Sequence, residues 1–213
     1  MRKGPADRNL ICLHGQLEDG PVLSHVNHGV EFFTLPLLVA RLSGARDRLN
    51  VIASGPLLAQ VPPLEQGLPL RVRGEVRTFN NRSGTGSRLV ITAFARELAV
   101  QEGEDENRLE LSGTLCKPPS LRFTPLGRTI CDMILAVNRR YGKADYLPCI
   151  AWGSLAHRCG ELTVGNRVEL NGRLQSRSYT KVVDDRPQER TAFEVSVMSL
   201  LPGNAADSQE PEE

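Results

Sequence analysis

Residues 168–174 read Val-Glu-Leu-Asn-Gly-Arg-Leu, and residues 70–76, which lie 98 positions earlier, read Leu-Arg-Val-Arg-Gly-Glu-Val. In both stretches apolar residues alternate with polar ones and a glycine stands at the fifth position. Alternation with a period of two is typical of a β-strand that buries one face. A glycine inside such a strand marks a bulge or a sharp bend. The two stretches therefore predict equivalent strands in two copies of one domain.

The same 98-residue offset superposes six of the 19 glycines on later glycines. Chance gives roughly one such coincidence at a given offset, so the agreement indicates a duplication. An acidic stretch, residues 102–106, lies between the copies. We expect a first domain over residues 1–101, a second domain over residues 107–202 and an acidic tail over residues 203–213. The superposed glycines are Gly15 on Gly113, Gly29 on Gly127, Gly44 on Gly142, Gly55 on Gly153, Gly67 on Gly165 and Gly74 on Gly172.

Five segments of the second copy show the alternation of strands: residues 109–115, 131–137, 145–152, 168–174 and 193–200. The segment from Ser154 to Leu162 falls between the third and fourth and is long enough for one short helix. Five strands with a helix after the third are the pattern of the oligonucleotide-binding (OB) barrel. The sequence therefore predicts an all-β protein of two tandem OB-fold Greek-key barrels, each with one short helix, followed by a disordered acidic tail.

Strand parity predicts which side chains of the second copy face outward. In the third strand Leu147, Cys149 and Ala151 face the core, so Tyr146, Pro148, Ile150 and Trp152 face out. In the fourth strand the outward positions carry arginines and continue to Tyr179. Exposed aromatic rings stack on bases without sequence preference, and arginines attract phosphates. This outer surface is the candidate nucleic-acid site.

Composition and charge exclude several classes of protein. With 40% hydrophobic and 24% charged residues, the chain is neither disordered nor fibrous. No apolar run reaches the ~18 residues of a membrane helix, and no signal-type stretch follows Met1, so we expect a cytoplasmic protein.

The five cysteines lack CxxC spacing and are interpreted as small core residues. His25 and His28 have no carboxylate or cysteine nearby to complete a metal site, and no spacing singles out a nucleophile with its base.

Both copies are basic, with net charges of +4 over residues 1–101 and +5 over residues 107–203. The acidic residues that balance this positive charge lie in the linker and the tail. Basic domains beside an acidic tail suit a polyanion binder whose tail competes for the groove, although a solvated charge run is the alternative interpretation.

Four stretches resemble the bacterial single-stranded DNA-binding proteins: residues 121–127, 134–141, 145–153 and 172–179. The resemblance extends in order from about Asn107 to Leu200. It implies an OB barrel, assembly into four barrels, and roles in DNA replication, repair and recombination. The four aromatic positions that stack on bases in this family fall on Tyr141, Tyr146, Trp152 and Tyr179. The family's terminal Pro-Phe pair is missing, since the chain ends Ser208-Gln-Glu-Pro-Glu-Glu213.

The first copy departs from that pattern. Ser43, Arg48, Ser54 and Asn81 occupy the positions of the four aromatics. A weaker DNA contact is predicted through Phe79 with Arg71, Arg73 and Arg77. In the second copy the predicted phosphate contacts are Arg139, Arg140, Arg173, Arg177 and Lys181.

These observations predict a protein that binds and coats single-stranded DNA without sequence specificity. We expect no catalysis, no cofactor, no metal and no membrane association. A homodimer would supply four barrels, and replication or repair proteins are possible partners in the nucleoid. Two alternatives stay open: a primosome-type accessory protein whose barrels bind other proteins, and an OB protein that binds RNA.

Overall fold

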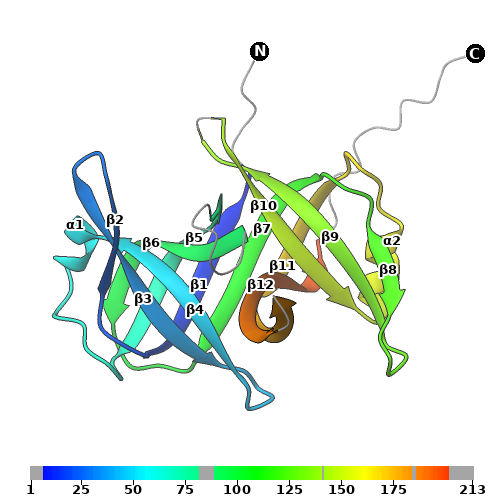
Figure 1. Ribbon diagram of the computed structural model, residues 1–213. Coiled ribbons are helices and arrows are strands. Elements are labelled where there is room, and N and C mark those ends of the chain that lie inside the picture. The colour runs from blue at the N-terminus through cyan, green and yellow to red at the C-terminus, as the bar shows by residue number, and fades with distance from the viewer. Residues whose placement is uncertain (1–6, 82–88, 141, 184–185, 202–213) are drawn as a thin grey trace, which may run out of the picture.

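A computed structural model describes residues 7–81, 89–140, 142–183 and 186–201 of the chain. Within this part it contains twelve strands and two short helices (Figure 1). The predicted tail at residues 203–213 lies outside the described residues. The strands form two barrels that lie side by side (Figure 1).

Barrel 1 closes in the order β1-β3-β4-β6-β5-β1. All of its strand pairs are antiparallel except β4–β6. A hairpin strand, β2, extends the sheet beyond β3. The elements are β1 (Asn9–Leu17), β2 (Val22–Asn27), β3 (Val30–Ala40), β4 (Arg46–Ser54), α1 (Gly55–Leu58), β5 (Pro69–Asn80) and β6 (Leu89–Val100).

Barrel 2 repeats this topology as β7-β9-β10-β12-β11-β7, with β10–β12 as its parallel pair. One helix follows the third strand of each barrel, so the predicted OB fold class is confirmed. Sequence reasoning missed the hairpin strands β2 and β8 and the long extensions of β11 and β12. The elements are β7 (Glu106–Leu115), β8 (Ser120–Phe123), β9 (Thr129–Asn138), β10 (Ala144–Trp152), α2 (Ser154–Gly160), β11 (Arg167–Val183) and β12 (Arg186–Leu200).

Two of the repeated glycines mark bulges, as their pattern predicts. The register of β5 with β6 shifts between Arg73 and Gly74, and that of β11 with β12 shifts between Asn171 and Gly172. A Cβ atom on Gly74 would lie 2.0 Å from the carbonyl oxygen of Phe94, and one on Gly172 would lie 2.5 Å from that of Ser196. A side chain cannot be accommodated at such distances, so glycine lets the crossing strands approach and the barrels close.

The core consists of the residues that the alternation places inward. Leu147, Cys149 and Ala151 are all buried, as are Val168 and the other inward residues of β11. Burial raises the pKa of Cys149, and it raises the pKa of Cys159 to about 11. These thiols therefore stay protonated near neutral pH and act as small apolar residues.

The first strands of the two barrels join them into one sheet. β1 pairs with β7 in antiparallel register, from Asn9 opposite Leu111 to His14 opposite Glu106. Asn9 pairs with Leu111, and Leu13 pairs with Asn107. Since Asn107 and Leu111 are the repeats of Asn9 and Leu13 at the 98-residue offset, exchanging the two copies leaves this pairing unchanged. The joint therefore has approximate twofold symmetry.

A pair of matching clasps crosses this joint. Asp145 of β10 accepts from the backbone N–H of Thr78 in β5 at 2.6 Å, and Asp47 of β4 accepts from that of Ser176 in β11 at 2.8 Å. Each carboxylate also binds an arginine of its own barrel, Arg139 and Arg41 respectively. Both aspartates are almost completely buried, and their hydrogen bonds raise the pKa of the paired arginines. Each clasp holds the long hairpin of one barrel against the other barrel.

Candidate nucleic-acid interface

Two predicted stacking residues lie on the outer face of β10. Tyr146 is 54% exposed and Trp152 is 42% exposed, while Leu147 and Ala151 between them are buried. The structure differs at Ile150, which strand parity places outward but which is only 5% exposed. Ile150 pairs with Asp132 of β9 and with Ser196 of β12, so a strand flanks it on each side. The two rings near the ends of β10 stay accessible to a planar ligand.

The cationic and aromatic residues of β11 form a second group. Arg177 is exposed, and its guanidinium lies 5.8 Å from the ring centroid of the half-buried Tyr179. Arg173 is half-buried, and its Nε atom has no hydrogen-bond partner among the described residues. β12 separates β11 from β10, so this group and the β10 rings lie on either side of one strand.

The extended end of β11 reaches the first barrel. Ser176 accepts a hydrogen bond from the backbone N–H of Arg48 in β4 at 3.1 Å. Arg48 itself pairs with Glu18. Arg177, one residue beyond Ser176, is therefore placed at the boundary between the barrels. Sequence parity could not show this, because the contact depends on how the two barrels dock.

Four further predicted residues lie in two places, three of them just before β10 and one near the end of β11. The structure engages Arg139 in the clasp, where it donates to Asp145 and to the carbonyl of Thr78. This engagement differs from the predicted phosphate contact, because the charge of Arg139 is already neutralised by a buried carboxylate. Arg140 beside it is exposed. Tyr141 lies outside the described residues, and so does the side chain of Lys181.

The weaker contact predicted for the first barrel lies on the outer face of β5. Phe79 is 52% exposed, and Arg71 and Arg73 are exposed as well. Arg73 lies 3.8 Å from Glu97, and Arg77 forms an ion pair with Glu75 at 3.1 Å. The pair of Arg73 is exposed and contributes little to stability, whereas Arg77 is 24% exposed and its guanidinium lies over the ring of Phe94.

Phe79 is also tied to the second barrel. Its neighbour Thr78 binds Asp145, and the Thr78 hydroxyl accepts from the backbone N–H of Tyr146 at 3.2 Å. The end of β5 therefore lies against the start of β10. Phe79 of the first barrel and Tyr146 of the second, both predicted site residues, are therefore placed near each other. The linear sequence did not indicate this proximity.

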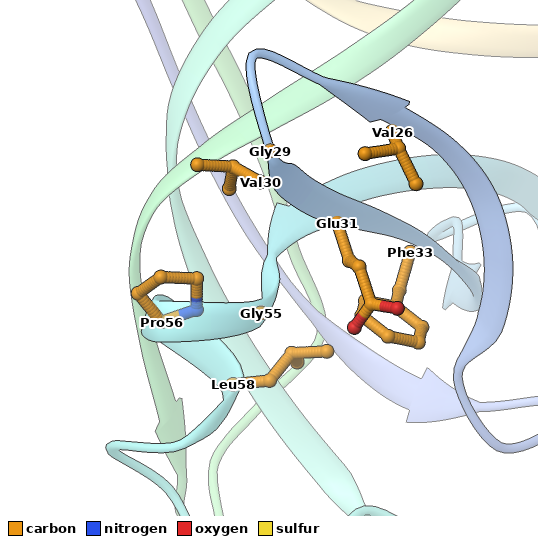
Figure 2. Close-up of a pocket in the computed structure, with 8 residues that line it drawn as sticks. All are labelled: Val26, Gly29, Val30, Glu31, Phe33, Gly55, Pro56 and Leu58. Carbon is orange, nitrogen blue, oxygen red and sulfur yellow. The ribbon is translucent and has the colours of Figure 1, made fainter.

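Other kinds of site have little support in the described residues. No group of three or more His, Cys, Asp or Glu side chains could hold a metal ion there, and no described helix is long and apolar enough to cross a membrane. A cavity of about 660 Å³ lies between the β2–β3 turn and α1 (Figure 2). Its single charged side chain is the carboxylate of Glu31, which would repel a phosphate backbone. The lining residues are Val26, Gly29, Val30, Glu31, Phe33, Gly55, Pro56 and Leu58.

The fold and this surface define a protein of tandem OB barrels with exposed rings and arginines on its strands. Residues 106–201 match the model of the single-strand binding protein family. The chain is 33% identical to single-stranded DNA-binding protein 2 of Listeria innocua over 108 residues. These residues cover 47% of this chain and 68% of the Listeria protein. The chain belongs to the single-strand binding protein family.

Two further comparisons describe the extent of the similarity. The single-stranded DNA-binding protein of Clostridium tetani is 39% identical over 80 residues, which cover 34% of this chain and 55% of that protein. The chain thus spans between about half and two thirds of the length of these relatives. The wild-type single-stranded DNA binding protein of Thermus aquaticus shares the fold over 97% of this chain and 98% of its own, with a TM-score of 0.75 and 24% identity.

Proposed function

We propose that the chain binds and coats single-stranded DNA without sequence specificity and without catalysis. The observation that carries this proposal is the pair of exposed rings, Tyr146 and Trp152, on β10 of the barrel that matches the family model. Every base has a π-face, so such rings stack on any sequence. Duplex DNA hides those faces, and therefore the surface favours single strands.

The second barrel is proposed as the main DNA-binding domain. Its residues 107–202 carry Tyr146, Trp152 and Tyr179, with Arg140, Arg173 and Arg177 as phosphate contacts. Residues 1–101 are proposed as the first domain of the chain. In the cell, such coating would serve DNA replication, repair and recombination.

Titration of the intact protein with oligonucleotides tests this function. Trp152 is the only tryptophan of the chain, so its fluorescence should be quenched as a base covers it. A thymidine single strand should bind more tightly than a duplex of equal length. Its affinity should fall linearly with salt on a log-log plot, because arginines that contact phosphates displace counterions.

Three other outcomes of this titration would change the proposed function. Tighter binding to a matching RNA strand would make the protein an RNA-binding OB protein. A flat salt response would remove the phosphate contacts from the proposal. Absence of binding to every nucleic acid would favour the role of an accessory protein that binds other proteins.

The proposal includes a homodimer with four barrels. Two tandem chains related by a twofold axis reach the number of barrels that the family resemblance implies. Light scattering should give a mass near twice the 23.4 kDa of one chain. A stable monomer, or a tetramer of whole chains, would contradict this part of the proposal.

A further inference from the structure

A groove lined mainly by apolar side chains lies between the β2–β3 hairpin and α1 of barrel 1 (Figure 2). Its volume is about 660 Å³. Val30 and Phe33 of β3 form one wall, and Pro56 and Leu58 of α1 form the other. Glu31 supplies the only charge in its lining. We call this space the hairpin groove.

The second copy of the domain provides an internal comparison for this lining. The strand register keeps the 98-residue offset here, because Phe33 pairs with Ala53 and Cys131 pairs with Ala151. Barrel 2 carries smaller or more polar residues at most of the equivalent positions, and it has the same topology. The OB fold therefore does not require an apolar lining at this place. The equivalent pairs are Val30 and Arg128, Glu31 and Thr129, Phe33 and Cys131, Pro56 and Ser154, and Leu58 and Ala156.

The helix beside the groove is shorter than the corresponding helix of barrel 2. α2 extends to Gly160, where an added Cβ atom would lie 3.4 Å from the side chain of Leu121, so α2 packs on its hairpin strand β8. α1 ends at Leu58, and the repeat of Gly160 is Pro62, which Pro63 follows. Proline disfavours the helical conformation in the residue before it. The two prolines therefore keep α1 from extending as far as α2.

Exposed apolar residues continue from the groove along β2. Val22, Leu23 and Val26 are 59%, 53% and 59% exposed, and Val26 also lines the groove. β2 stands at the end of the strand order and pairs with β3 alone among the described strands. An exposed apolar patch on such an edge is typical of a protein interaction site.

The charge of Glu31 indicates which partners suit the groove. Its side chain is exposed, and no described cation pairs with it. The repeat of Glu31 is the neutral Thr129, so the carboxylate belongs to barrel 1 alone. A carboxylate beside an apolar groove attracts a segment that carries a lysine or arginine next to its apolar side chains, and it repels acidic segments.

We propose that the hairpin groove binds another protein through a short segment of basic and apolar residues. One apolar side chain of this segment contacts Phe33 and Leu58, and a neighbouring lysine or arginine pairs with Glu31. The exposed apolar residues of β2 contact the flanking part of the segment. The groove uses neither Tyr146 nor Trp152, so this interaction is separate from the proposed binding of DNA.

Selection from a random peptide library displayed on phage, with the intact protein as the target, tests this proposal. The selected peptides should combine a large apolar residue with a lysine or arginine. Val30→Arg introduces the residue that barrel 2 carries at the same place, and it should weaken a selected peptide by about tenfold or more, because a charge then lies in the apolar wall. Glu31→Thr, also a barrel 2 residue, should weaken it by about two- to fivefold.

A second form of the selected peptide, with alanine in place of its lysine or arginine, tests the pairing with Glu31. This form should bind the wild type and Glu31→Thr with equal affinity, since neither complex contains the ion pair. An apolar contact without the ion pair would instead give the same loss for both forms, and this result would contradict the proposed role of Glu31.

Val164→Arg is the matched control, because it adds the same charge at a valine of barrel 2 that is 53% exposed. It should leave the peptide affinity unchanged, and circular dichroism checks the fold of each variant. Should Val30→Arg fail to fold, Val30→Thr keeps the shape of the side chain and replaces one methyl group by a hydroxyl. The affinity of Val30→Arg for single-stranded DNA should equal that of Val164→Arg.

Three results would overturn the proposal. The library could yield no peptide above background, or only acidic peptides, or peptides that bind the wild type and Val30→Arg equally. Light scattering separates a fourth case: a lower mass of Val30→Arg than of the wild type would make a second copy of the chain the occupant of the groove and would likewise overturn it. None of these results bears on the titration with DNA, so the proposed function stands or falls separately.

Discussion

Replacing both Tyr146 and Trp152 with alanine should nearly abolish the binding of single-stranded DNA. Each ring that stacks fully on a base contributes ~1 to 3 kcal/mol, so each single change should cost about 5- to 150-fold. Together they should cost about 30-fold to 20,000-fold if the two contacts are independent. The barrel should still fold, because the buried residues of β10 are untouched.

Fluorescence anisotropy with a labelled thymidine strand at one fixed salt concentration measures these losses. Trp152→Phe is the conservative control, because it keeps a ring at the same place and should retain most of the affinity. Phe79→Ala should cost less than Trp152→Ala, since Ser54 and Arg48 replace the rings in barrel 1. Normal binding by Trp152→Ala, or a larger loss in Phe79→Ala, would invert the assignment of the main site to barrel 2.

Removing the carboxylate of one clasp should strongly destabilise the molecule. Asp145 is 0% exposed and binds both Arg139 and the backbone N–H of Thr78. Breaking a buried pair from one side leaves an uncompensated charge, which typically costs ~3 to 5 kcal/mol. Asp145→Ala should therefore lower the free energy of unfolding by about 3 to 5 kcal/mol. Asp47→Ala, the equivalent change in the other clasp, should have a similar effect.

Denaturant unfolding followed by circular dichroism measures this change. Asp132→Ala is the matched control, because Asp132 pairs with Arg122 at the surface, where the two side chains are 42% and 50% exposed. Exposed pairs contribute ~1 kcal/mol or less. Arg139→Ala added to Asp145→Ala should restore part of the stability by removing the unpaired charge. Equal losses in Asp145→Ala and Asp132→Ala would refute a structural role of the clasp.

Much of the fold could be predicted because strand patterns are local. The alternation around Gly172 specifies which side of β11 faces the core, and this depends only on neighbouring residues. The duplication then transfers the result to the first copy. For the same reason the exposure of Tyr146 and Trp152 could be predicted from their parity with Leu147. Ile150 shows the limit, because its burial depends on the strands that flank β10.

The roles of charged residues could not be predicted in this way. Arg139 has the sequence context of a phosphate contact, yet its partner Asp145 also binds Thr78, which is 67 residues away along the chain. Asp145 lies in the same barrel as Arg139, and the other barrel adds the backbone N–H and carbonyl of Thr78 to this pair. The docking of β1 on β7 determines this arrangement.

The sequence by itself determined the repeat, the strands, their inward faces and the aromatic positions of the second barrel, because these follow from residue spacing within one element. Only the tertiary structure decided how the barrels share their surfaces. His25 of β2 stacks on Phe32 of β3, and Phe32 lies beside Phe94 of β6, because strand order and register bring these three strands' residues to one face. Contacts between distant segments depend on closure of the barrels and on their joint, and local patterns carry no record of either.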